Sequence, residues 1–180
     1  AHDRHFRGIT PEAMTAEAAI GEGGEARVVQ ITLADLAETW AELNIAQGED
    51  VDLVSLGNPH FSLTEIEALA GLCDGRQKAA GVELIVTCGR DVFAKAQAAG
   101  LIDTIRGFGG QVLNDTCWCF IGEPVVPQWV RTIATNSGKY AHYGPAAVER
   151  GFHFASLARC VDAACTGRID RRLPGWLRQA

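Results

Sequence analysis

The chain has 180 residues, of which 47% are hydrophobic and 21% are charged. This length and composition are typical of one folded domain with its own core, and they exclude a disordered or collagen-like chain. With 16 Lys and Arg against 22 Asp and Glu, the formal net charge is −6, so we expect no broad nucleic-acid-binding surface, which requires clustered positive charge.

Short apolar runs alternate with helical patterns along the chain. Residues 27–31 are predicted to form a strand, and apolar residues at helical spacing predict a helix over 32–43. Ser156 and Gly167 are expected to cap and end the last helix. In chain order, the further predicted strands are 51–56, 82–87, 111–113, 130–134 and 152–155, and the further predicted helices are 62–72, 91–99, 102–106 and 157–165.

The alternation of strands and helices predicts right-handed crossovers and a parallel sheet. Nearly continuous apolar strands, such as the run 84–86, are typical of a sheet that helices cover on both faces. We therefore predict a single α/β domain over residues 1–180, with three layers and a mainly parallel sheet flanked by helices.

Polar and sulfur-containing residues gather just after the predicted strands. Ligands of open α/β sheets bind outside the carboxyl ends of the strands, so we expect the functional site at this edge. The segments that follow the strands are 57–62 (GNPHFS), 87–90 (TCGR), 114–119 (NDTCWC), 135–143 (TNSGKYAHY) and the stretch from Ser156 to Cys160.

Several of these residues also have a purely structural interpretation. Ser62 and Glu65 match a helix capping box, and His60 fits an ordinary loop histidine. Residues 136–139 fit a turn that exposes Lys139. Trp118 is more typical of a core position than of a cofactor contact.

The six cysteines stand at irregular spacings, unlike those of a dense secreted disulfide scaffold. No apolar run approaches the roughly 20 residues of a membrane span, and no signal peptide is visible. We therefore expect a cytoplasmic location and no membrane partner. In that compartment, Cys73, Cys119 and Cys165 are interpreted as packing residues.

Cys117 and Cys160, with a third thiolate from another strand end, are candidates to hold an iron–sulfur cluster, because such clusters are bound mainly by thiolates. Burial remains the alternative for Cys160, which lies on an apolar helical stripe. A structural zinc site is less well supported, because paired short spacings are missing.

Five segments, in order along the chain, resemble the aconitase X family: 7–13 (RGITPEA), 57–62, 115–117, 135–143 and 160–167 (CVDAACTG). The resemblance implies an aconitase-like domain of an iron–sulfur hydro-lyase. Activities in this family include dehydration of cis-3-hydroxy-L-proline in bacteria and of mevalonate 5-phosphate in archaea. The resemblance covers only the later part of the catalytic region. We therefore expect a fragment or a piece of a larger enzyme, whose remaining domains or small subunit are its partners.

By this resemblance, Cys117 and Cys160 match cluster cysteines. Cys88 is the candidate third ligand and Cys119 is its alternative. We expect a cluster of the [2Fe-2S] rather than the [4Fe-4S] kind. Asn58 stands where archaeal members tend to have cysteine, which favours the bacterial hydroxyproline type.

Dehydration of a 3-hydroxy acid removes the proton α to the carboxylate and expels the β-hydroxyl group. Lys139 is expected to pair with the substrate carboxylate, and Ser137 to hydrogen-bond to it. His60 is expected either to protonate the leaving group or to orient a ligand. The base is expected on a domain outside this chain. Further substrate contacts are expected from Asn58, Ser62, Asn136, Tyr140 and Tyr143.

Two alternatives to cis-3-hydroxy-L-proline dehydration stay open. The first keeps the cluster but changes the substrate to another hydroxy acid, such as mevalonate 5-phosphate. The second is a non-catalytic α/β assembly domain, in which the cysteines are core residues and no iron is bound.

Overall fold

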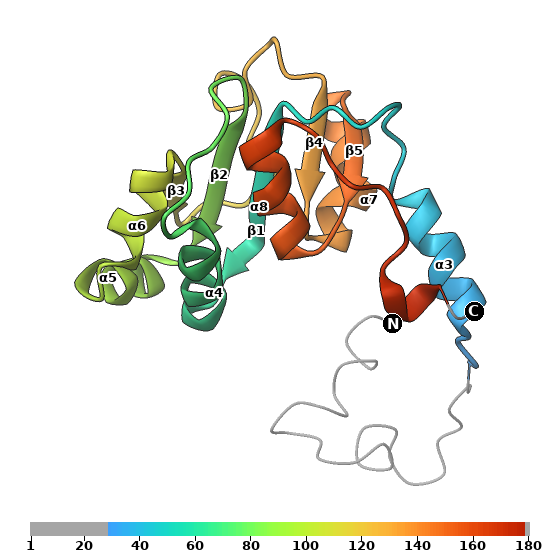
Figure 1. Ribbon diagram of the computed structural model, residues 1–180, viewed down its shortest axis with the longest axis horizontal. Helices are drawn as coiled ribbons and strands as arrows, with labels where there is room; N and C mark the ends of the chain where they lie inside the picture. Colours follow the sequence, from blue (N-terminus) through green and yellow to red (C-terminus); the bar gives the residue numbers. More distant parts are fainter. Residues whose placement is uncertain (1–28, 179–180) are drawn as a thin grey trace, which may run out of the picture. The chain divides into compact units, whose positions relative to one another are not determined.

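The computed structural model describes residues 29–178, and the chain falls into two units, residues 1–32 and 33–180. The second unit contains the helices and strands drawn in Figure 1. In the first unit, residues 29–32 have no regular secondary structure. The predicted strand at 27–31 is therefore wrong for residues 29–31. Its first two residues, like the motif at 7–13, lie outside the described part.

Five strands form one sheet in the order β3-β2-β1-β4-β5, and every neighbouring pair is parallel. This confirms the predicted α/β class. Each strand lies within a few residues of a predicted position. The strands are β1 (Leu53–Phe61), β2 (Glu83–Cys88), β3 (Gln111–Asn114), β4 (Thr132–Thr135) and β5 (Gly151–Phe154).

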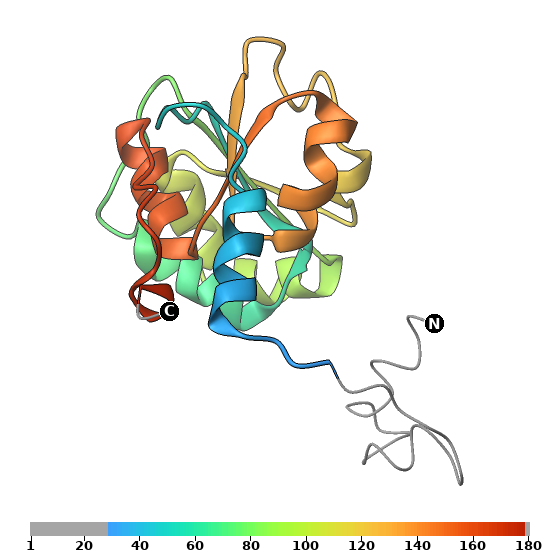
Figure 2. The same ribbon diagram turned by 90° about the vertical axis from the view of Figure 1, so that its right-hand side faces the viewer.

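Helices cover both faces of this sheet, which gives the predicted three layers (Figure 2). One face carries α4 (Leu63–Cys73), α5 (Arg90–Ala98), α6 (Leu101–Phe108) and α8 (Leu157–Thr166). The other carries α7 (Gly138–Val148) and the short 3-10 helix η2 (Trp118–Phe120). At the C-terminal end, η3 (Gly175–Leu177) contacts α3 (Leu33–Glu42).

The two layers of helices bury alternate residues of the same strands. Val54 and Leu56 of β1 belong to the core on the α4 and α8 side. Leu53 belongs to the opposite core, with Trp118 and Tyr140. Burial on both faces explains why the strands have nearly continuous apolar sequences.

Helix boundaries follow the capping residues in the sequence. The Ser62 side chain accepts a hydrogen bond from the Glu65 backbone N–H, and the Glu65 carboxylate accepts one from the Ser62 N–H, which completes a capping box at α4. Ser156 caps α8, and Gly167, in the left-handed conformation, ends it. The structural interpretation of Ser62 is therefore confirmed.

Helix α7 begins where the sequence analysis allowed a turn. Ser137 caps its first turn, and Pro145 lies inside it. A Cβ atom on Gly144 would lie 2.3 Å from a ring carbon of Phe152, so only glycine lets α7 approach β5 this closely. Glycine and proline have low helix propensity. The sequence pattern therefore did not predict α7, which contains Gly144 and Pro145.

Strand β1 continues to Phe61, although the strand was predicted to end at residue 56, with residues 57–62 following it. Its register with β2 shifts between Leu56 and Phe61. Gly57 has a φ of +80°, and a Cβ atom there would lie 2.1 Å from the Thr87 carbonyl oxygen. The Thr87 hydroxyl group donates to the Gly57 carbonyl oxygen over 2.6 Å. These contacts shape the end of the central strand.

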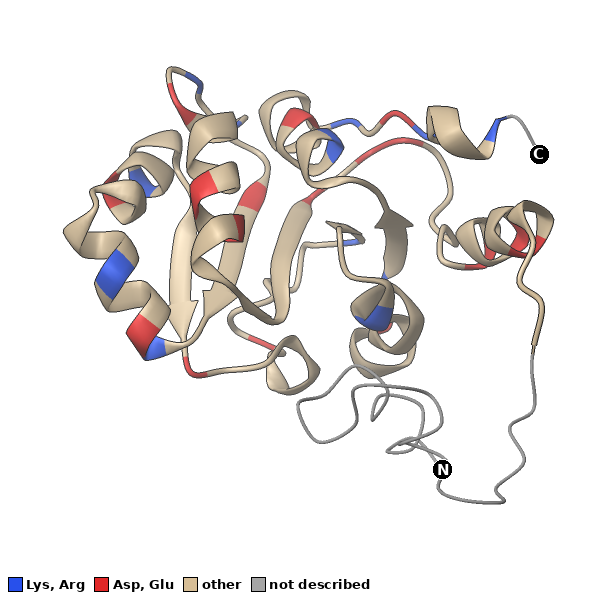
Figure 3. Cartoon of the chain, turned by 90° about the horizontal axis from the view of Figure 1, so that it is seen from below, with Lys and Arg blue, Asp and Glu red and all other residues tan. Residues whose placement is uncertain are grey.

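Charged residues of both signs are interspersed over the described elements in the view of Figure 3. In the described part of the chain, no helix has the length and apolar character needed to cross a membrane.

Candidate active site

The direction in which successive strands are added to the sheet reverses at β1. Strands β2 and β3 lie on one side of β1, and β4 and β5 lie on the other. Helix α4 follows β1 onto one face of the sheet, and α7 follows β4 onto the other. The two connections therefore part at the carboxyl ends of β1 and β4. This switch point is where open α/β sheets bind their ligands.

Ser137 and Asn58 join these two strand ends. The Ser137 hydroxyl group donates to the Asn58 carbonyl oxygen over 3.3 Å. It also accepts from the Tyr140 backbone N–H over 3.2 Å, as the cap of α7. The serine thus places the first turn of α7, with Lys139, beside the end of β1.

The side-chain amide of Asn58 is buried, and neither its nitrogen nor its oxygen has a hydrogen-bond partner. A buried polar group left without a partner costs about 1–3 kcal/mol, so such groups call for an explanation beyond stability. Asn136 is half-buried and Lys139 is exposed at the same edge. The structure therefore brings together four of the predicted site residues at the switch point: Asn58, Asn136, Ser137 and Lys139.

A second group of polar side chains lies at the ends of β2 and β3. Asp115 accepts hydrogen bonds from the Arg90 backbone N–H over 2.9 Å and from the Arg90 Nε over 2.5 Å. The Asp115 N–H donates to the Cys88 carbonyl oxygen over 3.0 Å. His60 is exposed, and its Nε2 lies 2.9 Å from the Thr116 carbonyl oxygen.

The backbone N–H of Arg90 and then its side chain lower the pKa of Asp115, and nearby His60 acts in the same direction. The carboxylate therefore stays ionised. Asp115 and Arg90 were not among the predicted site residues. Asp115 adopts a left-handed φ of +54°. Asp is one of the few non-glycine residues that adopt this conformation, so an Asp just after a strand was the sequence signal for this turn.

The candidate cluster cysteines have different environments. Cys88 and Cys160 are buried, and Cys117 is half-buried. Burial raises the pKa of the Cys160 thiol to about 12, and burial followed by the charge of Asp115 raises that of Cys88. A cysteine binds a metal as its thiolate, so a cluster here would have to offset the cost of ionising these buried thiols.

Within residues 29–178, no group of three or more His, Cys, Asp or Glu side chains is placed to hold a metal ion. These residues, taken alone, therefore do not form a cluster site. The assignment of Cys88, Cys117 and Cys160 as ligands stays a prediction.

The two tyrosines predicted to contact the substrate have different environments. Tyr140 is fully buried, with its ring 5.3 Å from that of Trp118 and 5.0 Å from that of Phe152. It is a core residue in this structure. Tyr143 is exposed and packs edge-on against His142 at 4.7 Å.

Of the three cysteines interpreted as packing residues, two pack in the core and one is exposed. Cys73 is buried at the end of α4, and Cys165 packs against the same core. Cys119 is exposed, because its place in the single turn of η2 directs it to solvent. The packing role predicted for Cys119 is wrong.

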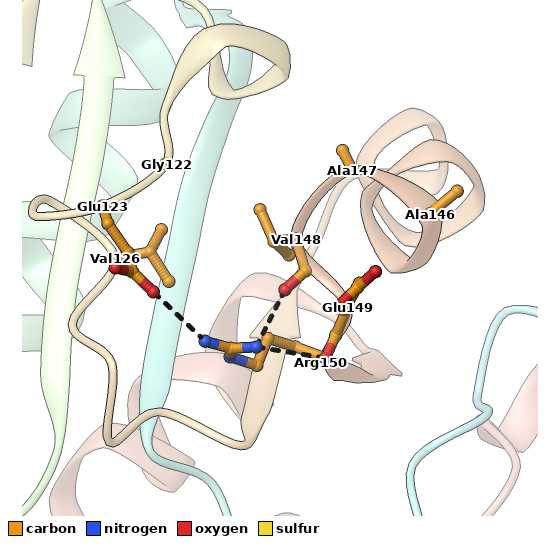
Figure 4. Close-up of a pocket in the computed structure, with 8 residues that line it drawn as sticks. All are labelled: Gly122, Glu123, Val126, Ala146, Ala147, Val148, Glu149 and Arg150. Atoms are coloured by element: carbon orange, nitrogen blue, oxygen red, sulfur yellow. Dashed lines mark hydrogen bonds and ion pairs between the residues drawn. The ribbon is translucent and has the colours of Figure 1, made fainter.

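Three cavities of the described chain are lined by residues other than those at this edge. One of 260 Å³ is lined by the 122–126 loop and the end of α7 (Figure 4). There the Arg150 guanidinium lies 3.7 Å from the Glu123 carboxylate and donates to the Val148 carbonyl oxygen. Others of 410 and 230 Å³ lie beside Cys73 and Trp40.

A doubly wound parallel sheet with polar side chains at its switch point defines an α/β domain of the ligand-binding kind. Such a fold hosts many activities, so a closer assignment needs sequence relatives. The chain belongs to the aconitase X family, because the sequence model of the "Aconitase X third domain" matches residues 51–166.

Two curated relatives are cis-3-hydroxy-L-proline dehydratases. That of Hypocrea jecorina is 51% identical over 96% of this chain, and that of Pseudomonas aeruginosa is 46% identical over 97%. The chain spans 29% and 30% of their respective lengths. A more distant relative is the phosphomevalonate dehydratase large subunit of Thermococcus kodakarensis, which is 33% identical over 77% of this chain and 34% of its own length.

The crystal structure of aconitase X from Thermococcus kodakaraensis in its holo form has a similar fold. The TM-score is 0.67 at 26% sequence identity, over 79% of this chain and 36% of that one. The family and the fold predicted from the sequence are therefore confirmed.

Proposed function

We propose that this chain is one domain of a larger hydro-lyase that dehydrates cis-3-hydroxy-L-proline. The observation that carries the proposal is the link between Asn58 and Ser137 at the switch point, which puts family segments 57–62 and 135–143 at one edge. Identities of 51% and 46% to two dehydratases of that name support this substrate.

The proposed reaction breaks the Cα–H bond and the C3–O bond. A base takes the α-proton, and the electron pair of the Cα–H bond forms the C2–C3 double bond. The hydroxyl group leaves with one proton as water, so the products are a dehydroproline and water. Negative charge builds up on the substrate carboxylate during this step, and fixed positive charges nearby stabilise it.

Lys139 is proposed to pair with the carboxylate, as an exposed ammonium group in the first turn of α7. Ser137, already fixed by two hydrogen bonds, is proposed to contact the same carboxylate. His60 is proposed to protonate the leaving hydroxyl group. When its Nε2–H donates to Thr116, Nδ1 remains to carry the transferred proton. The base is proposed to belong to another part of the enzyme.

An iron–sulfur cluster, of the [2Fe-2S] rather than the [4Fe-4S] kind, belongs to this proposal. When bound, it supplies a Lewis acid. Cys117, Cys160 and Cys88 are the proposed ligands, although within residues 29–178 their side chains do not form a group that could hold a metal. A cytoplasmic location and remaining domains or a small subunit as partners complete the proposal.

Mevalonate 5-phosphate is the second candidate substrate, because relatives at 33% identity are phosphomevalonate dehydratase large subunits. Phosphate recognition favours arginine. Along the segments after the strands, the sequence offers Arg90 and Arg159. Arg159 is paired with Asp170, so these segments hold no arginine cluster for a phosphate, which favours the unphosphorylated substrate.

The test is a direct comparison of the two substrates with the full-length enzyme, purified without oxygen. We expect turnover of cis-3-hydroxy-L-proline and none of mevalonate 5-phosphate. Turnover of the phosphorylated acid alone would refute the proposed substrate. Iron and sulfide assays on the same sample test the cluster.

A further inference from the structure

Arg90 is held in an unusual way for an exposed arginine. Its backbone N–H and its Nε both bind Asp115, so the carboxylate fixes one side of the guanidinium. Neither Nη atom makes a hydrogen bond or ion pair with any described residue, and the side chain is 77% exposed. The guanidinium is therefore oriented but retains free donors.

Arg90 carries its positive charge at the start of a helix. Arg90 is the first residue of α5, where the positive end of the helix dipole disfavours a cation. The cation at this end is balanced by Asp115, which binds both its backbone N–H and its Nε. A cation kept at the positive end of a helix, at the carboxyl edge of the sheet, is consistent with a functional site.

Arg90 and Lys139 lie on opposite sides of the central strand end. Arg90 follows β2 and Lys139 follows β4, and both strands pair with β1. Neighbouring strands lie about 4.8 Å apart, so β2 and β4 are about 10 Å apart. Two long basic side chains can reach one small molecule across this distance.

The proposed reaction calls for a second cation. Removing the proton α to a carboxylate converts it into an enediolate, which carries two negative charges over two oxygens. One lysine is a point charge, whereas a guanidinium binds a carboxylate through paired N–H groups. Preorganised donors aimed at developing charge are a major source of rate enhancement.

We propose that Arg90, braced by Asp115, is a catalytic residue that binds the substrate carboxylate and, with Lys139, stabilises the enediolate. This inference rests on the proposed function. The Nη groups contact the carboxylate oxygens, while the Asp115 carboxylate keeps the guanidinium turned toward them. Arg90 thereby adds a specific contact for an α-carboxylate to the site at the end of β1.

The experiment measures both turnover and binding in the full-length enzyme. Arg90→Gln is expected to lower kcat/KM for cis-3-hydroxy-L-proline about 100-fold, the loss of a charge-assisted pair. Arg90→Lys keeps the charge but loses the paired N–H groups. Its kcat/KM is expected to lie between those of the wild type and Arg90→Gln. The planar anion pyrrole-2-carboxylate serves as a non-reacting probe. Its dissociation constant is expected to rise about 10-fold or more in Arg90→Gln.

Arg106→Gln is the matched control. Arg106 is also exposed and ion-paired, to Asp103 in α6, and we expect unchanged kinetics and probe binding. Asp115→Asn keeps the Arg90 charge but releases the guanidinium, so it is expected to raise KM and weaken the probe.

The binding measurement separates this inference from the proposed function. If the wild type binds the probe and Arg90→Gln binds it equally well, the role of Arg90 is refuted, even when hydroxyproline is turned over. If hydroxyproline is not turned over but the probe binds through Arg90, only the proposed reaction is refuted. A wild type that binds no probe would overturn the Arg90 inference. Should Arg90→Gln fail to fold, Arg90→Lys and Asp115→Asn decide by the same two readouts.

Discussion

Lys139 is the exposed cation that the Ser137 cap holds at the start of α7. In the full-length enzyme, Lys139→Ala is expected to lower kcat/KM for cis-3-hydroxy-L-proline about 100-fold, because the carboxylate loses a charge-assisted contact. Steady-state kinetics measure this change, with Lys95→Ala on α5 as the control. Unchanged turnover and affinity in Lys139→Ala would contradict the assignment.

His153 of β5 is a fully buried titratable residue. Burial lowers its pKa, and Arg171 acts in the same direction, while Asp50 opposes both. The unfolded chain therefore binds a proton near pH 6.5 that the folded chain binds only at lower pH. By linkage, the contribution of His153 to stability is present above about pH 6.5 and is lost as the pH falls below it.

We therefore expect the free energy of unfolding to drop between pH 7.5 and 5.5, by up to about 1.4 kcal/mol for each pH unit below the unfolded pKa. His153→Leu should flatten this dependence. Urea unfolding at a series of pH values measures the free energy of unfolding of the wild type and of His153→Leu. Equal slopes in the two chains would show that His153 is not the group responsible.

Single residues differ in how far the sequence predicts their role. Ser62 and Glu65 interact locally, so their capping box was predictable from spacing alone. The burial of Tyr140 depends on Trp118 and Phe152, which come from distant elements. The pairing of Arg90 with Asp115 likewise joins the ends of two strands. Contacts of this kind are set by tertiary structure, which no local pattern reports.

At the scale of the elements, the conformation of the end of β1 depends on Gly57. Gly57→Ala would place a Cβ atom 2.1 Å from the Thr87 carbonyl oxygen at a φ of +80°. Overpacking and left-handed strain together are expected to destabilise the chain by about 3 kcal/mol. Chemical denaturation measures this change.

Gly71→Ala in α4 is the matched control for that substitution. A Cβ atom at Gly71 meets nothing within 4 Å, and alanine favours a helix over glycine by about 0.5–1 kcal/mol. We expect it to stabilise the chain. If Gly57→Ala were as stable as the original chain, the tight approach of β1 to β2 would be refuted.

Elements with strong periodic patterns were predicted well. Strand β2 and helix α8 lie within a residue or two of their predicted bounds. Helix α7 was missed because it contains Pro145 and two glycines, and its stability comes from packing rather than propensity. The irregular end of β1 was missed because the register shift with β2 depends on the neighbouring strand.

At the scale of the whole molecule, the candidate site lies at the carboxyl ends of β1 and β4, at the switch point of the sheet. The chain also spans only 29% and 30% of two related dehydratases. This coverage fits the proposal that the chain is one domain of a larger enzyme. The position of this edge follows from strand order and was predictable.

The most direct test of the proposed dehydration follows the α-proton. The full-length enzyme is incubated with cis-3-hydroxy-L-proline that carries deuterium at C2, and the product is followed by NMR. We predict that each molecule dehydrated releases its deuterium to the solvent, with slower turnover than for the unlabelled compound. A failure to dehydrate this substrate, or release of water without loss of the C2 deuterium, would contradict the account.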